Sequence, residues 1–177
     1  MAPFTVGSLS ARHRPAIEQV LQAADVFRDE ELAVALELFD EALGPAARAS
    51  GDYEFVGAFA QAGELAGYAC FGPTPGTDGT YDLYWIAVHP AHQGRGAGGA
   101  LLGEVERRLR DRHGRLVVIE TSARDAYETT RRFYGRHGYG MSARLRDFYA
   151  PTDDRVIFTK HLVDSPTAAL CGANGDE

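Results

Sequence analysis

The chain has 177 residues, of which 45% are apolar and 24% are charged, and its formal net charge is −7. These values predict one globular domain with a substantial core and argue against a general nucleic-acid-binding or membrane-binding surface. Because only two cysteines occur and no run of about 18 apolar residues is present, we expect no disulfide framework, no membrane span and a cytoplasmic location.

The first half of the chain is expected to form a strand, two helices and a hairpin, because its apolar residues change from alternating to helical spacing and back. The expected elements are a strand at 4–8, helices at 10–24 and 29–43, and antiparallel hairpin strands at 53–60 and 64–71. Phe27 lies between the two helices and is a candidate for lining a substrate pocket.

The second half is expected to contain one glycine-rich strand-to-helix connection, followed by a further strand, a helix and two strands. The expected elements are a strand at 81–88, a loop at 93–99, a helix ending before Gly114 as its C′ residue, a strand at 116–121, a helix at 122–137, strands at 139–146 and 155–162, and a loop at 147–154. A buried helical stripe is predicted at Leu101, Leu102, Val105 and Leu109.

The order of these elements predicts the fold class. A single βαβ unit lies in the middle, and antiparallel signals flank it on both sides. We therefore expect an α/β (α+β) protein with a mixed, mostly antiparallel sheet, one central parallel βαβ unit and helices on both faces. The strand at 116–121 is almost wholly apolar, which predicts cover on both of its faces. We expect one domain over 1–164 and a disordered tail over 165–177.

The glycine-rich loop predicts an anion site. The first turn of a helix carries backbone N–H groups without an intrahelical partner, at the positive end of the helix dipole. Four of six residues are glycine, at Gly94, Gly96, Gly98 and Gly99, and glycine lets a phosphate approach that backbone closely. A basic stripe in the following helix is interpreted as a solvated helix face in preference to a site for a nucleotide 3′-phosphate. Its members are Arg107, Arg108, Arg110, Arg112 and Arg115.

Two interpretations of the loop compete. Residues 94–99 fit G-x-G-x-x-G, and Glu120 follows about twenty residues later, as in a dinucleotide-binding fold. Residues 89–93, however, separate the strand from the first glycine, and too few βαβ units follow for a doubly wound sheet. A nicotinamide-dependent oxidoreductase is therefore the weaker hypothesis.

The phrase WIAVHPAHQGRGAGG at 85–99, followed by FYGRHGY at 133–139, resembles the GNAT superfamily of acyl-CoA-dependent N-acetyltransferases. The resemblance covers 5–162 and is strongest over 82–139. It implies a GNAT-like fold with acetyl-CoA as cosubstrate. The loop and helix start would hold the pyrophosphate, through Gln93, Gly94, Arg95, Gly96, Ala97, Gly98 and Gly99. The backbone of Ile86, Ala87 and Val88 would pair with the pantetheine amides.

The same resemblance places Tyr134 near the coenzyme A sulfur. Seven residues before that tyrosine the family often has Asn, with Ala three residues later, whereas this chain has Tyr127 and Thr130. Tyr127 is therefore a further candidate for cofactor contact. Many family members are dimers, so a homodimer is implied as one possible assembly.

Acyl transfer from a thioester to an amine needs a base, because an alkylammonium of pKa near 10.4 costs roughly 4–5 kcal/mol to deprotonate at pH 7. It also benefits from a proton donor to the departing thiolate. Tyr134 is the candidate donor. The base candidates are Asp82 first, Glu120 second, and bulk water third. The sequence shows no metal-ligand spacing and no credible nucleophile arrangement, which favours direct transfer.

These observations predict an N-acetyltransferase that acts on a primary amine of a small molecule, such as an amino-acid-like metabolite or an antibiotic. A protein or peptide amine acetyltransferase and a non-catalytic acyl-CoA-binding module remain alternatives. The aromatic candidates for an acceptor pocket are Phe27, Tyr84, Trp85, Phe148 and Tyr149. A bulge in the central strand would change which of them face the pocket.

Overall fold

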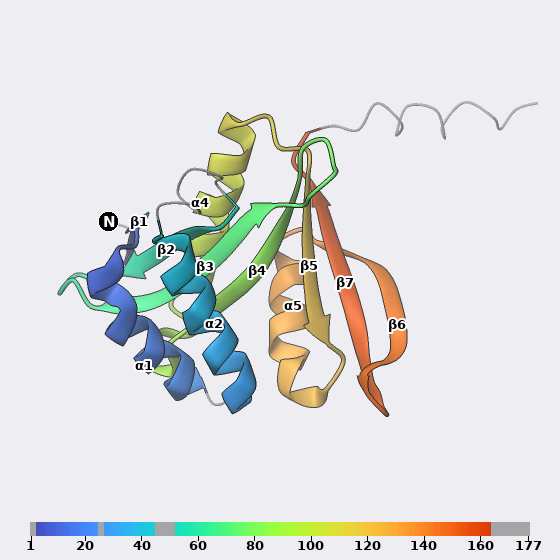
Figure 1. Ribbon diagram of the computed structural model, residues 1–177, viewed down its shortest axis with the longest axis horizontal. Helices are drawn as coiled ribbons and strands as arrows, with labels where there is room; N and C mark the ends of the chain where they lie inside the picture. The colour runs from blue at the N-terminus through green and yellow to red at the C-terminus, as the bar shows by residue number, and fades with distance from the viewer. Residues whose placement is uncertain (1–2, 25–26, 45–51, 164–177) are drawn as a thin grey trace, which may run out of the picture.

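A computed structural model describes residues 3–24, 27–44 and 52–163 (Figure 1). The elements, in chain order, are β1 (Thr5–Ser8), η1 (Ala11–His13), α1 (Arg14–Ala24), α2 (Asp29–Ala42), β2 (Glu54–Phe59), β3 (Leu65–Pro73), β4 (Thr80–Val88), η2 (Pro90–His92), α4 (Ala97–Asp111), β5 (Leu116–Ser122), η3 (Asp125–Tyr127), α5 (Glu128–Arg136), β6 (Gly140–Ala150) and β7 (Asp153–His161). Within these ranges, no helix has the length and apolar character needed to cross a membrane.

The seven strands form one sheet in the order β1-β2-β3-β4-β5-β7-β6. The pair β4–β5 is parallel and is connected through α4, and every other neighbouring pair is antiparallel. This arrangement confirms the predicted mixed sheet with one central βαβ unit. It also contradicts the dinucleotide-binding interpretation, which requires a doubly wound parallel sheet.

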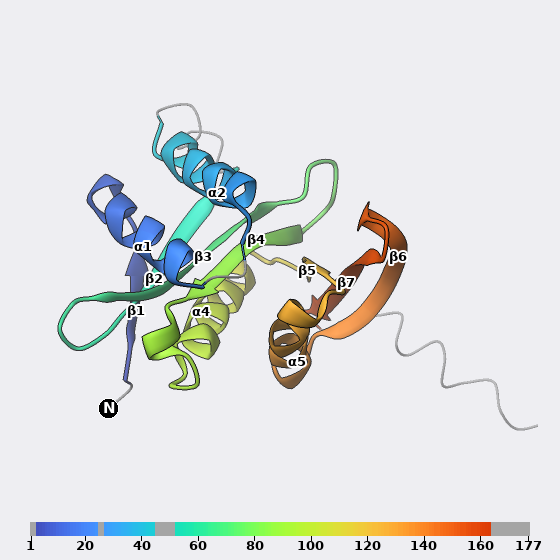
Figure 2. The ribbon, with the colours of Figure 1, turned by 90° about the horizontal axis from the view of Figure 1, so that it is seen from below.

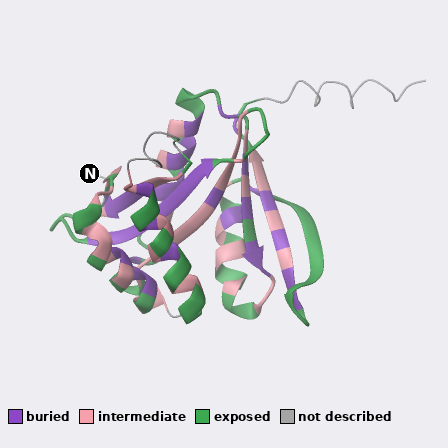
Figure 3. Cartoon of the chain, viewed as in Figure 1, coloured by how far each residue is buried: buried purple, intermediate pink, exposed green. Residues whose placement is uncertain are grey.

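Helices cover both faces of the sheet, with α1 and α2 on one face and α4 and α5 on the other (Figure 2). Two apolar clusters correspond to these faces. On the first face, Ile17, Leu21 and Phe39 pack near Tyr68 of β3. On the second, the predicted α4 stripe of Leu101, Leu102, Val105 and Leu109 is buried, which confirms it. Complete burial of one such side chain contributes about 1.5–3 kcal/mol. Strand β3 is accordingly buried along nearly its whole length, β4 is largely of intermediate exposure, and β6 is exposed along its length (Figure 3).

Two predicted element boundaries in the C-terminal half are wrong. The helix expected from Ser122 begins later, with η3 at Asp125, because Ser122 ends β5 and its hydroxyl bonds the Asp153 carboxylate. The loop expected at 147–154 is largely strand, because β6 runs on to Ala150 after an irregularity in its pairing with β7.

The predicted helix end at Gly114 is wrong by one residue. His113, with φ of 59°, takes the left-handed C′ position, and the Gly114 N–H bonds the Leu109 carbonyl at 2.8 Å. Gly114 is instead needed for space, because a Cβ there would lie 2.9 Å from that same carbonyl oxygen.

The strand at 116–121 was predicted to be covered on both faces, and this is also wrong. Val117 and Ile119 are buried on the α4 side, whereas Val118 is only half-buried and Glu120 is exposed on the other side. The helices α1 and α2 cover β3 and β4 but do not extend over this face of β5 (Figure 2). An acidic residue is therefore tolerated in an apolar strand because its side chain reaches solvent.

The only lysine of the chain joins three elements. Lys160 of β7 donates from Nζ to Glu106 of α4, at 2.8 and 2.9 Å from the two carboxylate oxygens, and to the carbonyl of His137 after α5, at 2.9 Å. Tyr139 donates to the same carboxylate at 3.2 Å, and the Glu106 side chain is only 9% exposed. This network ties α4 to the strands beyond β5.

Replacing Lys160 with Met should lower the free energy of unfolding by about 2 kcal/mol, because it leaves a nearly buried carboxylate without one of its cations. The matched variant Arg132→Met breaks an exposed pair with Glu128 and should change stability by less than about 0.5 kcal/mol. Urea denaturation of both variants measures the difference. Equal losses in the two variants would contradict the role given to Lys160.

Candidate functional site

A cleft opens where β4 and β5 separate. Their parallel pairs run from Thr80↔Leu116 to Leu83↔Ile119 and end there, although β4 continues to Val88 and β5 to Ser122. The cleft has a volume of about 290 Å³. Its lining residues are Asp82, Leu83, Tyr84, Val118, Glu120 and Arg155. Beyond Leu83, the edge of β4 that faces β5 has no strand partner in the described part of the chain.

A β-bulge at Tyr84 begins at the point of separation. Cys70 of β3 pairs with Trp85 and Phe71 pairs with Leu83, so Tyr84 is the extra residue of β4. Leu83 packs with the α4-side cluster and Trp85 with the α1/α2-side cluster, while Tyr84 lines the cleft with Asp82. The bulge therefore interrupts the alternation that the sequence alone would assign.

The two candidate bases, Asp82 and Glu120, line the same cleft but have different partners. Asp82 accepts a hydrogen bond at 2.6 Å from the hydroxyl of Thr74, and no Lys, Arg or His in the described ranges forms an ion pair with it. Glu120 forms a close ion pair with Arg155, whose guanidinium also lies 4.5 Å from the centre of the Phe148 ring. Glu120 thus has a cationic partner, whereas Asp82 has none among the described residues.

Two of the candidate tyrosines are held neutral: Tyr84, which lines the cleft, and Tyr134, which is buried in the apolar cluster on the α4 side. Burial, followed by the charge of Asp82, raises the pKa of Tyr84 to about 12. Burial also raises the pKa of Tyr134 well above its usual range, because a phenolate would be desolvated among Phe158 at 5.8 Å and other aromatic rings. The Tyr134 hydroxyl has no hydrogen-bond partner among the described residues and is available as a donor.

The glycine-rich loop places unpaired backbone N–H groups at the start of α4. Gly94 and Gly96 have φ of 69° and 97°, in the region that favours glycine, and Gly96 is the residue before the first turn. The Ala100 N–H bonds the Gly96 carbonyl at 2.9 Å. The N–H groups of the three residues between them, 97–99, therefore have no intrahelical acceptor and can bind an anion.

Gly98 and Gly99 serve helix packing as well as anion access. A Cβ on Gly98 would lie 3.2 Å from the Phe133 ring, and a Cβ on Gly99 would lie 3.0 Å from the His137 imidazole. Two of the four glycines predicted to clear space for a ligand thus allow α4 to approach α5. Gln93 has a structural contact of its own, since its side-chain amide donates to the Val88 carbonyl at 3.0 Å.

The structure brings some of the predicted aromatic pocket residues together. The rings of Phe27 and Trp85 are 5.5 Å apart, and the ring of Tyr84 lies 5.2 Å from that of Tyr53. Tyr149 lies on β6 and is exposed, beside the ring of Phe148. Its pKa is raised by burial, then by Asp153 and Tyr127.

Tyr127 occupies η3 before α5. Burial, followed by the charge of Glu31, raises its pKa, and the guanidinium of Arg124 lies 5.3 Å from its ring centre. It therefore belongs to the same end of the molecule as Tyr149 and the start of α2.

Sequence reasoning missed three lining residues of the cleft, Leu83, Val118 and Arg155. It also missed Thr74, which donates a hydrogen bond to the lining residue Asp82. Thr74 lies in a turn without a recognisable motif, so no local signal identifies it. Arg155 could have been found from alternation in β7, because it lies between the buried Asp154 and Val156 and so faces the opposite side of the sheet.

The basic stripe is largely neutralised, which supports its interpretation as a solvated helix face. Glu104 pairs with Arg107 and Arg108, at 2.9 and 2.8 Å, and its pKa falls to about 2, chiefly through the hydrogen bond from Arg107. The other members also have acceptors: Arg110 pairs with Glu106, Arg112 with Glu54, and Arg115 donates to the Asp78 carbonyl.

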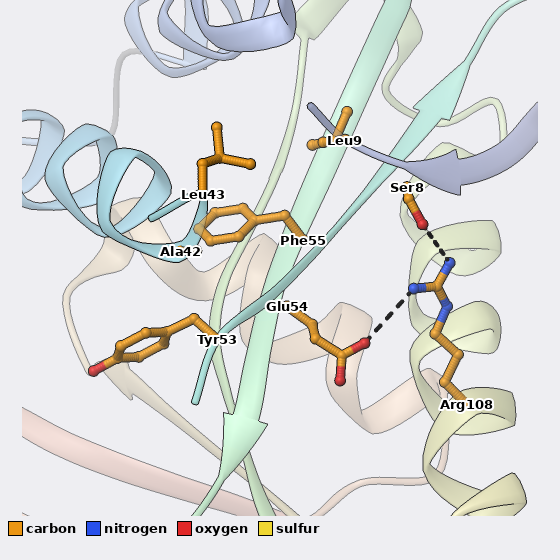
Figure 4. A pocket seen from close by; sticks show the side chains of 8 residues that line it. All are labelled: Ser8, Leu9, Ala42, Leu43, Tyr53, Glu54, Phe55 and Arg108. Carbon is orange, nitrogen blue, oxygen red and sulfur yellow. Dashed lines mark hydrogen bonds and ion pairs between the residues drawn. The ribbon is translucent and has the colours of Figure 1, made fainter. Parts of the chain in front are cut away.

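A second cavity, of about 240 Å³, shares no lining residue with the cleft. It lies between the end of α2, the strands β1 and β2, and α4 (Figure 4). Arg108 crosses it to Glu54 at 3.7 Å and to Ser8 at 3.4 Å. In the described ranges, no cluster of three or more His, Cys, Asp or Glu residues could hold a metal ion.

Comparison with known proteins identifies related folds. A family model described as acetyltransferase (GNAT) family matches residues 15–139. No curated protein matches the sequence significantly. Among solved structures, a GNAT-family protein from Desulfovibrio desulfuricans has a TM-score of 0.84 and 42% identity, covering 90% of this chain and 99% of that one.

Two more distant structures share the fold. The ribosomal-protein-S18-alanine N-acetyltransferase from Escherichia coli has a TM-score of 0.72 at 21% identity, covering 98% of this chain and 99% of that one. An aminoglycoside 6′-N-acetyltransferase complexed with coenzyme A has a TM-score of 0.71 at 17% identity, covering 92% and 99%.

Alanine substitutions of Gly96, before α4, and Gly103, within α4, should distinguish the effect of a strained backbone conformation on stability from the effect of helix propensity. Gly96→Ala should destabilise the fold by about 1 kcal/mol, because alanine is strained at a φ of 97°. Gly103→Ala, at an exposed helical position where a Cβ meets nothing within 4 Å, should stabilise it by about 0.5–1 kcal/mol. Urea denaturation provides both values. Effects of the same sign would contradict the conformational role of Gly96.

Proposed function

Since the chain belongs to the GNAT acetyltransferase family, and is an acyl-CoA-dependent N-acetyltransferase with acetyl-CoA as its cosubstrate, we propose that it acetylates a primary amine of a small molecule in the cytoplasm. The observation that carries this proposal is the small cleft at the separation of β4 and β5, which contains the carboxyl group of Asp82 without a cationic partner among the described residues.

The described residues fit coenzyme A. The unpaired N–H groups of 97–99 and the glycine backbone at Gly94 and Gly96 suit its pyrophosphate, and the exposed Arg95 has no ion pair among the described residues and adds a positive charge. The unpaired edge of β4 over 86–88 suits the amides of pantetheine, as an added half-strand. Because Gln93 already occupies the Val88 carbonyl, its side chain orders the loop and leaves the pyrophosphate to the backbone.

Asp82 is proposed as the base that receives the ammonium proton, directly or through water. Glu120 is less suited, because its carboxylate is already engaged in the ion pair with Arg155. Asp82 carries only a neutral hydrogen-bond donor, and it lies in β4 beside the point where the sheet opens. The neutral amine then attacks the thioester carbonyl, the carbon–sulfur bond breaks to release the thiolate, and the nitrogen gives its second proton to solvent as the amide forms.

Tyr134 is proposed to stabilise the departing thiolate. Its raised pKa keeps the hydroxyl protonated at all physiological pH values. Complete transfer of that proton to a thiolate of pKa about 8.5 would be uphill and would leave a buried phenolate. The hydroxyl therefore acts as a hydrogen-bond donor to the sulfur, and solvent supplies the proton that completes the thiol.

The cleft favours a small cationic acceptor. Asp82 and Glu120 contribute two negative charges and Arg155 one positive charge, so the lining has a net charge of −1 and attracts an ammonium group. A volume of about 290 Å³ lies at the lower end of the range for ligand sites. Of the similar structures, one acts on an aminoglycoside and one on a ribosomal protein alanine. A protein amine acceptor is the second candidate.

A panel of small primary amines tests the acceptor class. We expect acetyl-CoA-dependent thiol release with at least one cationic small amine, and at least tenfold lower kcat/KM with peptide N-termini. Acetylation of peptides alone would contradict the small-molecule proposal. A non-catalytic binding module would instead give a thermal shift with acetyl-CoA, no thiol release with any amine, and no effect of Tyr134→Phe.

Paired carboxamide variants test the base. Asp82→Asn should lower kcat/KM by about 10²–10⁴, because it removes the proton acceptor without changing side-chain size. Glu120→Gln should lower it less than about tenfold, because it disturbs only the partner of Arg155. Coenzyme A binding, measured by calorimetry, should be unchanged in both. A larger loss in Glu120→Gln would reverse the assignment.

A further inference from the structure

We infer that Thr74 is a positioning residue for the catalytic carboxylate, an inference that rests on the proposed role of Asp82. The Thr74 hydroxyl donates to Oδ2 of Asp82 at 2.6 Å, across the turn between β3 and β4. This contact holds one carboxylate oxygen and leaves Oδ1 for the acceptor amine or its water.

The turn itself fixes Thr74 before any substrate arrives. Its N–H donates to the Thr80 carbonyl at 2.9 Å, and its carbonyl accepts from the Thr77 hydroxyl at 2.7 Å. Both ends of the Thr74 backbone are therefore held, and the hydroxyl bonds Asp82 from this fixed backbone. A carboxylate that is ordered in advance loses less entropy when the reacting groups come together.

A neutral donor suits a base better than a cation does. The charged and titratable groups that line the cleft with Asp82 are Tyr84 on its own strand, Glu120 on β5 and Arg155 on β7. Arg155 pairs with Glu120, and Tyr84 stays protonated because its pKa is about 12. The hydrogen bond from the Thr74 hydroxyl thus orients Asp82. Unlike an ion pair, this bond places no positive charge beside the carboxylate, and such a charge would make the carboxylate a weaker base.

The turn between β3 and β4 has a place in the site although its sequence carries no functional motif. The turn at 74–79 is exposed and lacks a ligand-binding motif, yet it contains Thr74 eight residues before Asp82. Since β3 and β4 are antiparallel neighbours, with Gly72 opposite Asp82, a residue two positions beyond Gly72 can reach back to the carboxylate. The turn is therefore part of the site.

The first test is independent of the acceptor. Carbon-13 NMR of [γ-¹³C]aspartate-labelled protein follows each carboxyl through a pH titration, and Asp82→Asn identifies the Asp82 resonance by its loss. In Thr74→Val, which removes the hydroxyl at constant size, the Asp82 midpoint should rise by about one pH unit, because the ionised carboxylate loses a donor. Thr74→Ser should restore the wild-type midpoint.

The second test uses the amine with the highest turnover. Thr74→Val should lower kcat about tenfold, with the KM for acetyl-CoA within about twofold of wild type, and should move the acid limb of the pH–rate profile upward with the NMR midpoint. The control is Thr77→Val, which removes a hydroxyl of the same turn that bonds only backbone carbonyls. Because the Thr74 hydroxyl and the bond from its N–H to Thr80 remain, Thr77→Val should move the NMR midpoint and the acid limb much less than Thr74→Val does.

Each failure has a distinct signature. A wild-type midpoint in Thr74→Val, or equal changes in Thr74→Val and Thr77→Val, would overturn the positioning role and assign both residues to turn stability. Full activity of Asp82→Asn would instead overturn the proposed base, whatever the NMR titration shows.

Discussion

The divergence of β4 from β5 is the constraint on which the rest of the site depends. The two strands pair over four residues only, and the bulge at Tyr84 begins directly after their last pair. A bulge bends and twists the strand that carries it, so β4 turns away from its parallel neighbour while β3 continues to follow it. The result is an open strand edge, a cleft on one face and two groups of strands, without any loss of the sheet's continuity.

An open sheet of this kind needs ties across the gap. Close packing of Gly98 against Phe133 brings α4 onto α5, so that the helix after β4 contacts the helix after β5. The Lys160–Glu106 contact adds a charged tie between β7 and α4. These contacts keep the glycine-rich start of α4, the proposed anion site, in a fixed relation to Tyr134, as the proposed direct transfer between two bound substrates requires.

The sequence predicts the parts of this molecule that are encoded locally. The strand, glycine loop and helix at 81–114 carry their signals within about thirty residues, as does the buried α4 stripe. The choice between Asp82 and Glu120 could not be made in the same way, because the ion pair of Glu120 depends on the register of β5 against β7, where Ser122 faces Arg155.

The bulge at Tyr84 was equally beyond local reasoning, since nothing in an apolar strand marks the residue that is left unpaired. The same applies to the late start of the α5 segment. The Ser122 hydroxyl, which suggested a helix cap, accepts from the Arg124 N–H but also donates to Asp153, thirty-one residues later. Long-range contacts of this type decide the details of the site, while the short motifs decide its location.

The position of Lys160 has a consequence for the chemical stability of the protein in the presence of its own cosubstrate. Acetyl thioesters modify accessible lysine side chains slowly without a catalyst, and only an unprotonated amine with a free lone pair can react. The chain has one lysine, and its ammonium donates to both oxygens of Glu106 and to a backbone carbonyl. Arginine, which these thioesters do not acylate readily, supplies the other surface cations, so lysine self-acetylation is suppressed by composition and by structure together.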